Sequence, residues 1–261
     1  MKKQTTERIS AGYTWPAEIW PALTVLLLLT TWQAAGSSGI IPKFMLPTPV
    51  DVVKAFISDF PLLMSNAKVT LVEAFIGLGM GVAVGFVIAM LMDRFEKLYQ
   101  AFYPLIVLTQ TIPTVAIAPL LVLWFGYEML PKVILIVITT FFPITVSLQN
   151  GFKSADKEMI SLMRSMGASK IQVFRLVKFP GALGQFFASL RISASYAVVG
   201  AVISEWLGGF NGLGVYMTRV KKGFSFDKMF AVIFLISAIS LALMGLVNLA
   251  QKKCMPWEER K

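Results

Sequence analysis

Six long apolar windows constrain the fold of this sequence more than any other feature. They cover residues 19–41, 69–92, 98–125, 130–150, 186–207 and 229–251. About 20 helical residues cross a hydrocarbon layer roughly 30 Å thick, so each window is long enough for one span. The 56% of hydrophobic residues and the mean hydropathy of +0.72 exceed what water-soluble domains show. An ordinary soluble fold is therefore excluded.

Helices are the expected spanning structure, because a helix satisfies its own backbone hydrogen bonds within the hydrocarbon. The windows lack the alternation of a membrane barrel, although Pro104, Pro113 and Pro119 interrupt the third one. The first window follows Lys2 and could be a secretory signal peptide. A retained helix is favoured because apolar character continues to Ile41 and five windows follow. We predict an all-α polytopic membrane protein with six transmembrane helices.

The distribution of lysine and arginine predicts how these helices are oriented. With a cytoplasmic N-terminus, most basic residues fall on the cytoplasmic side, whereas the opposite side holds Lys43, Lys54, Lys68, Lys132, Arg219, Lys221, Lys222 and Lys228. Because cytoplasmic loops are enriched in Lys and Arg, both termini are expected inside. The predicted parts are a cytoplasmic segment 1–18, a transmembrane domain 19–251 with a cytoplasmic loop 152–180, and a cytoplasmic tail 252–261. Attraction to the lipid bilayer accounts for the net charge of +10, and nucleic-acid binding is not expected.

The residue inventory excludes most enzyme chemistry. The sequence has no histidine, no phosphate-binding loop of the form Gly-x-x-x-x-Gly-Lys-Ser/Thr and no Gly-x-Ser-x-Gly elbow. Its single cysteine, Cys254, cannot form an internal disulfide and is interpreted as an ordinary thiol rather than a lipidation site. We expect no catalytic residue, metal or cofactor on this chain, so any ATP is handled by a partner.

The loop 152–180 is too long and too regular for a simple connection. Four residues spaced i, i+3, i+4 and i+7 form an apolar stripe on a short helix: Met159, Leu162, Met163 and Met166. Gly167 follows where a left-handed cap is expected, Ser169 with Gln172 starts a second helix, and Pro180 is expected to end it. From the pattern alone, the pair could lie on the membrane surface or dock into a groove on a moving partner.

The same loop resembles the signature of binding-protein-dependent ABC importer permeases. That signature is Glu-Ala-Ala, three residues, Gly, nine residues, Ile-x-Leu-Pro; here Gly167 and Pro180 keep the spacing, while residues 161–163 read Ser-Leu-Met. Further elements are similar to the aliphatic sulfonate, taurine, nitrate and thiamine-precursor branch: Leu46-Pro47-Thr48-Pro49, Ile112-Pro113, Trp124-Phe125-Gly126, Phe141-Phe142-Pro143 and Gly212-Leu213-Gly214. The resemblance covers about residues 42–249.

The resemblance implies a type I permease subunit in the inner membrane of a bacterial cell. Two permease copies would pair, ATP-binding-cassette ATPase subunits carrying ATP and Mg would dock on the cytoplasmic loops, and an external binding protein would deliver the solute. The residues that it assigns to the coupling helix and its turn are Met159, Leu162, Met163, Met166, Gly167, Ala168, Ser169 and Pro180.

Polar and aromatic residues within the spans are the candidates for lining the pathway, because ionisable groups there are costly. They are Glu73, Gln110, Phe141, Phe142, Ser204 and Glu205. For Glu205 a helix-bracing role is an equal alternative, and Arg191 is expected to snorkel or to pair with a carboxylate. Gly77, Gly81 and Gly85 are interpreted as a close helix-packing face, with gating as the alternative.

The substrate is predicted from the same inventory. The outer halves of the spans offer Glu73 and Glu205 but no Arg or Lys, which favours a neutral or weakly cationic solute. A thiamine-related pyrimidine is therefore preferred to a sulfonate, taurine or nitrate. A secondary transporter is disfavoured because no internal repeat is visible, and an intramembrane enzyme because no nucleophile and base are clustered.

Overall fold

The computed structural model describes residues 19–39, 41–42 and 44–256, and these residues form helices and connecting turns only. The helices are α1 (Ile19–Ser37), α2 (Pro49–Ser58), α3 (Phe60–Arg94), α4 (Glu96–Thr109), α5 (Thr114–Phe125), α6 (Met129–Lys153), α7 (Lys157–Ser165), α8 (Lys170–Val173), the π turn η1 (Phe174–Lys178), α9 (Phe179–Leu207), α10 (Leu213–Lys222) and α11 (Phe226–Cys254). The all-α prediction is confirmed for this part of the chain. The predicted segment 1–18 and residues 257–261 of the tail lie outside the described residues.

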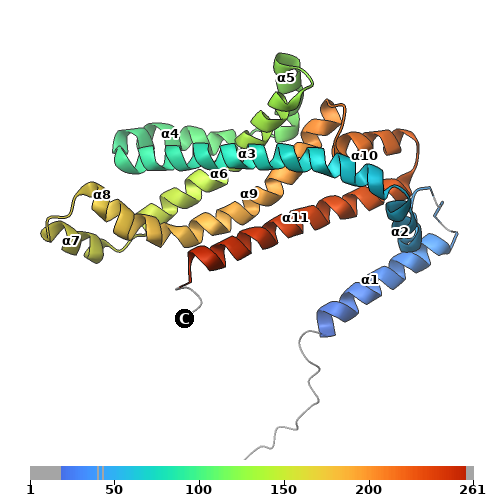
Figure 1. Ribbon diagram of the computed structural model, residues 1–261, viewed down its shortest axis with the longest axis horizontal. Coiled ribbons are helices and arrows are strands. Elements are labelled where there is room, and N and C mark those ends of the chain that lie inside the picture. Colours follow the sequence, from blue (N-terminus) through green and yellow to red (C-terminus); the bar gives the residue numbers. More distant parts are fainter. Residues whose placement is uncertain (1–18, 40, 43, 257–261) are drawn as a thin grey trace, which may run out of the picture.

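Five helical stretches are long and apolar enough to cross a membrane: α1, α3, α6, α8 through α9, and α11. The third apolar window instead gives two helices, α4 and α5, which meet at a bend of 95°. Pro113 lies at this break as the residue before α5, where a missing N–H removes no helical bond. Six spans are reached only if the bent pair is one span. Figure 1 shows α5 projecting from the side of the bundle.

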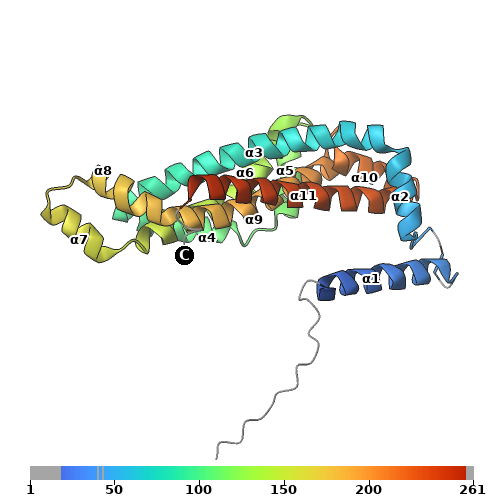
Figure 2. The same cartoon turned by 60° about the horizontal axis from the view of Figure 1, so that its bottom comes forward.

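The centre of the molecule is formed by α3, α6 and α9, with α11 alongside (Figures 1 and 2). A buried cluster joins Ala74 of α3 and Ile136 of α6 to small residues of α9 such as Ala197 and Ala201. Small side chains permit close approach of the helix axes, which supplies much of the packing in a lipid environment.

The glycines of α3 lie on the face that touches α6. A Cβ on Gly77 would stand 2.5 Å from Cβ of Ile136, and one on Gly85 would stand 2.8 Å from the carbonyl oxygen of Phe141. A Cβ on Gly81 would collide with Oγ1 of Thr140, whereas Gly79 faces open space. The structure therefore places the predicted packing face against a specific partner helix.

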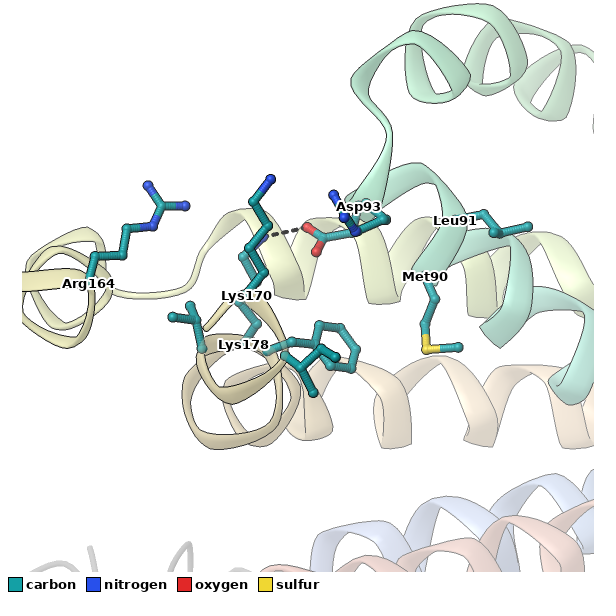
Figure 3. Close-up of a pocket in the computed structure, with 10 residues that line it drawn as sticks. Met90, Leu91, Asp93, Arg164, Lys170 and Lys178 are labelled. Carbon is teal, nitrogen blue, oxygen red and sulfur yellow. Dashed lines mark hydrogen bonds and ion pairs between the residues drawn. The ribbon is translucent and has the colours of Figure 1, made fainter. Parts of the chain in front are cut away.

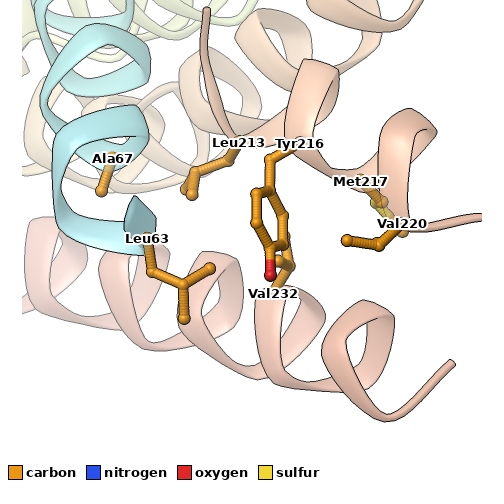
Figure 4. Packing of buried hydrophobic residues seen from close by; sticks show 7 residues of the cluster. All are labelled: Leu63, Ala67, Leu213, Tyr216, Met217, Val220 and Val232. Carbon is orange, nitrogen blue, oxygen red and sulfur yellow. The ribbon is translucent and has the colours of Figure 1, made fainter. Parts of the chain in front are cut away.

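Two short helices, α2 and α10, cover one end of the bundle, and α7 and α8 form the opposite end (Figure 1). Thr48 and Asp51 make a capping box at the start of α2. The apolar windows did not predict α10, which packs Tyr216 against Leu63 of α3 and Val232 of α11 (Figure 4). We call these the α10 end and the α7 end.

Helix α1 lies beside the bundle rather than within it, and only 6% of its apolar window is buried (Figure 2). One of its contacts with the rest of the chain is made by Trp32, whose ring centroid lies 5.7 Å from that of Phe230 and 5.8 Å from that of Phe234. The Trp32 indole N–H also donates a 3.0 Å hydrogen bond to the Pro47 carbonyl. Residues 19–37 form one helix.

Candidate functional site

The turn after α7 is fixed by backbone hydrogen bonds. Asp156 caps the start of the helix by accepting from the Glu158 amide at 2.8 Å. At its end Gly167 adopts φ +82°, the Ala168 amide donates to the Met163 carbonyl at 2.9 Å, and the Gly167 amide donates to the Arg164 carbonyl at 3.0 Å. This pair of bonds is a Schellman motif, which requires the left-handed residue that glycine supplies without strain.

The second helix begins as the sequence predicts and ends differently. The Ser169 hydroxyl accepts from the Gln172 amide at 3.3 Å, and the Gln172 side chain accepts from the Ser169 amide at 2.7 Å. The prediction that Pro180 ends this helix is wrong, because the chain continues through the π turn η1 into α9. Pro180 lies in the first turn of α9, and the wider π turn before it accommodates the missing N–H.

The apolar stripe of α7 faces solvent in the single chain. Met159, Leu162 and Met166 are 47%, 57% and 79% exposed, and Met163 is half-buried beneath them. No residue of α7 is buried. Exposed methionine and leucine side chains on one helical face suit an apolar groove on another protein, because methionine adapts its shape to a partner.

The base of this loop, unlike its tip, is packed into the bundle. Val173 is buried, and the ring centroids of Phe174 and Phe152 lie 5.2 Å apart. Lys178 Nζ forms a 2.6 Å ion pair with Asp93 near the end of α3. The base of the loop is therefore tied to α3 by an ion pair and to α6 by an aromatic contact.

The two intramembrane carboxylates belong to a buried polar network at the α10 end. Glu73 Oε1 lies 2.6 Å from Lys132 Nζ, and both side chains are enclosed. Sequence reasoning placed Lys132 in an outer loop, but it lies within the first turn of α6. The premise that the outer halves of the spans carry carboxylates without a nearby cation is therefore wrong.

Glu205 holds the start of α10. Its Oε1 accepts from the Thr70 hydroxyl at 2.7 Å and its Oε2 accepts from the Gly214 amide at 2.6 Å. The Leu213 amide donates to the Thr70 hydroxyl, and the Gly212 amide donates to the Asn66 side chain, both at 2.9 Å. The first N–H groups of α10 are thus satisfied by side chains of α3 and α9, as an uncapped helix start requires. These contacts favour the bracing role for Glu205.

The remaining candidates differ in exposure. Ser204 is buried and donates to the Ala201 carbonyl at 2.8 Å, Phe141 and Phe142 are half-buried in α6, and Gln110 is exposed at the bend between α4 and α5. Arg191 donates to the side-chain oxygens of Asn248 and Gln251 at 2.9 and 2.6 Å. Among the described residues the polar partners of Arg191 are thus side-chain amides, whereas the sequence predicted that it would snorkel or pair with a carboxylate.

Sequence reasoning missed a second ionic contact at the α10 end. Asp59 accepts a 2.6 Å hydrogen bond from the Tyr216 hydroxyl and pairs with Lys228 at 2.9 Å. These two partners hold the pKa of Asp59 below its ordinary value. The contact ties α3, α10 and α11 together. Partners so distant in sequence leave no local pattern to find.

Comparisons with known proteins agree with this architecture. Residues 81–255 match the family model described as the binding-protein-dependent transport system inner membrane component. The formylaminopyrimidine transport permease protein ThiX of Halalkalibacterium halodurans is 35% identical over 92% of this chain and 96% of its own length.

Two further relatives are named for other substrates. The riboflavin transport system permease protein RibX of Chloroflexus aurantiacus is 31% identical over 92% of this chain and 91% of its own length. The putative aliphatic sulfonates transport permease protein SsuC of Bacillus subtilis is 26% identical over 88% and 84%. A solved structure of the MetNI methionine ABC transporter in an inward-facing conformation is 20% identical, covers 76% of this chain and 97% of its own, and has a TM-score of 0.63. That likeness shows the fold.

Proposed function

Because this chain belongs to the family of binding-protein-dependent transport system inner membrane components, in the sulfonate, taurine and thiamine-precursor branch, we propose that it is the membrane subunit of an ATP-driven importer. The observation that carries the proposal is the exposed stripe of Met159, Leu162 and Met166 on a helix whose turn is rigidly capped. Such a face needs a partner, and ATP-binding-cassette ATPase subunits that bind ATP and Mg are the partner that this family implies.

The α7 end is then cytoplasmic, and both termini lie on that side of the bacterial inner membrane. An external binding protein delivers the solute to the α10 end. The excess of Lys and Arg in the loop 152–180 supports this orientation.

A second copy of the chain completes the pathway in this proposal. Large apolar side chains on the bent pair and on α1 have no cover in the single chain, for example Leu123 at 78%, Trp124 at 66% and Leu28 at 63% exposure. Lipid covers part of such a surface, and a homodimer interface covers the rest. Gln110 at the bend, with Phe141 and Phe142 of α6, is proposed to line the passage between the copies.

The packed base of the loop suggests how ATP binding and hydrolysis open and close the passage. Closure of the ATPases displaces α7, and the Lys178–Asp93 pair with the Phe174–Phe152 contact moves α3 and α6 as rigid helices. The switch works if the ATPases contact the two permease states differently. The hydrogen bonds of Glu73 and Glu205 hold α3 to α6 and α9 to α10, so that the α10 end moves as a unit.

The proposed substrate is a thiamine-precursor pyrimidine. The carboxylates of the spans do not support this choice, because Lys132 is paired with Glu73. It rests instead on the 35% identity to a formylaminopyrimidine permease, against 26% to a sulfonate permease. An aliphatic sulfonate, taurine or nitrate is the alternative.

Reconstitution tests both levels of the proposal. The permease, its ATPase and its binding protein are placed in vesicles, and uptake of labelled formylaminopyrimidine and of taurine is followed with and without ATP. We expect saturable, ATP-dependent uptake of the pyrimidine. Saturable uptake of taurine alone would overturn the substrate, and uptake that is indifferent to ATP would overturn the importer.

A further inference from the structure

A cavity of about 430 Å³ opens at the α7 end, between the last turns of α3 and the loop of α8 and η1 (Figure 3). The basic residues Arg94, Arg164, Lys170 and Lys178 line it together with one acid, Asp93. Its walls also include apolar side chains from both elements. The proposed coupling role uses the stripe of α7, the Lys178–Asp93 pair and Phe174, and it leaves the other basic residues of this cavity without a function.

The cavity carries an excess of positive charge. Lys178 is neutralised by Asp93, but within the described part of the chain no carboxylate pairs with Arg94, Arg164 or Lys170. All three lie exposed, and Figure 3 shows the long side chains of Arg164 and Lys170 extending on the same side as Asp93. Clustered cations attract an anion with several acceptor oxygens, for which a phosphate group is suited.

The apolar walls identify the rest of the ligand. Leu91 and Ile171 are 45% and 72% exposed, and Met90, Val173 and Phe174 complete the apolar lining. Leu91 lies in the last turn of α3, a candidate membrane span that ends at Arg94. The cavity is thus at the level where hydrocarbon gives way to head groups, so a free anion would leave its apolar part uncovered.

We propose that this cavity binds an anionic phospholipid of the cytoplasmic leaflet. The head-group phosphate lies at Arg94, Arg164 and Lys170, and the part of the acyl chain nearest the head group lies against Leu91 and Ile171. Basic cavities between spans on the cytoplasmic side favour such lipids. The inference rests on the orientation in the proposed function. A lipid held there bridges α3 to α8 and steadies the loop that positions α7.

Native mass spectrometry of the purified permease with its ATPase tests the inference. The complex is offered phosphatidylglycerol, phosphatidylcholine or inorganic phosphate. We expect preferential retention of phosphatidylglycerol, and a loss of about fivefold in affinity for each cation removed in Arg94→Gln and Lys170→Gln. Arg94→Lys should retain most of the binding, which separates loss of charge from misfolding. The control is Arg219→Gln with Lys222→Gln at the α10 end, which should change nothing.

Several outcomes would overturn the site. They are equal retention of phosphatidylcholine, unchanged retention in the Arg94→Gln and Lys170→Gln variants, and displacement of the lipid by inorganic phosphate at a similar concentration. Binding that appears only after the ATPase is removed would assign the cavity to the ATPase instead. The readout involves no transport, so failure of the uptake assay and failure of lipid binding are distinguishable.

Discussion

Lys132 Nζ of α6 lies 2.6 Å from Glu73 Oε1 of α3, and the two side chains are only 5% and 4% exposed. The second oxygen of Glu73 has no hydrogen-bond partner among the described residues. A buried pair of this kind adds little net stability, but removal of one partner strands a charge. It therefore fixes how α3 meets α6 at the α10 end.

Removal of either member alone should destabilise the protein strongly. We expect Glu73→Leu and Lys132→Leu each to cost about 3 to 5 kcal/mol, because each leaves an unpaired buried charge. The double variant should cost much less than the sum, since no lone charge remains. Thermal unfolding of the purified protein in detergent measures the cycle. Additive losses would contradict a direct interaction.

The glycine face of α3 provides a matched pair of substitutions on one helix. Gly81→Ala introduces a Cβ against Thr140 and should destabilise by about 1 to 3 kcal/mol, as overpacking does. Gly79→Ala meets nothing within 4 Å and should be neutral or stabilising by about 0.5 to 1 kcal/mol. The same unfolding measurement compares them. Equal effects would show that α6 does not approach α3 as described.

Gly167 is the conformational test of the loop. Gly167→Val cannot easily adopt φ +82°, so the Schellman turn should open while the spans remain inserted. We expect normal membrane levels with ATP-driven uptake lost. Gly167→Asn is the control, because asparagine tolerates the left-handed region and should keep much of the uptake. Wild-type uptake by the valine variant would contradict the turn's role.

Asp59 should make the free energy of unfolding depend on pH. Its folded pKa is depressed by Tyr216 and Lys228, so its contribution is complete above the unfolded value of about 4. That contribution is lost as pH falls from the unfolded pKa through the lower folded pKa. Thermal midpoints between about pH 6 and 3 should fall less steeply for Asp59→Asn than for the unchanged protein. Parallel curves would exclude this linkage.

The sequence predicts the spans well because hydrophobic length is a local property. The windows 130–150 and 229–251 lie within α6 and α11. The left-handed conformation of Gly167 and the capping role of Ser169 are also local, because each follows from the residue type and its neighbours. Helix α10 escapes notice because it is short and its apolar face, which includes Tyr216 and Val220, alternates with basic residues.

Contacts between residues far apart in the chain could not be predicted from the sequence. Glu73 and Lys132 are 59 positions apart, and Thr70 and Glu205 are 135 apart. The count of basic residues placed Lys132 outside the hydrocarbon, because the sequence does not show that Glu73 of the neighbouring helix α3 pairs with it. The two carboxylates therefore do not indicate the substrate, whereas the predicted fold rests on the apolar windows.

The stripe of α7 is proposed to dock an ATPase and to couple it to transport, and one substitution tests that role. Met166 is 79% exposed, so Met166→Asp should leave the permease folded and place a charge in the proposed interface. Met163→Asp should act in the same direction, although Met163 is half-buried in the loop itself. Ser161→Asp, on the opposite face of α7, adds the same charge outside the stripe.

The measurement is co-purification of the ATPase with each permease variant, together with ATP-driven uptake by the reconstituted complex. We expect Met166→Asp to lose ATPase association and uptake together, while Ser161→Asp keeps both. Retention of the ATPase and of normal uptake by Met166→Asp would contradict the docking assignment.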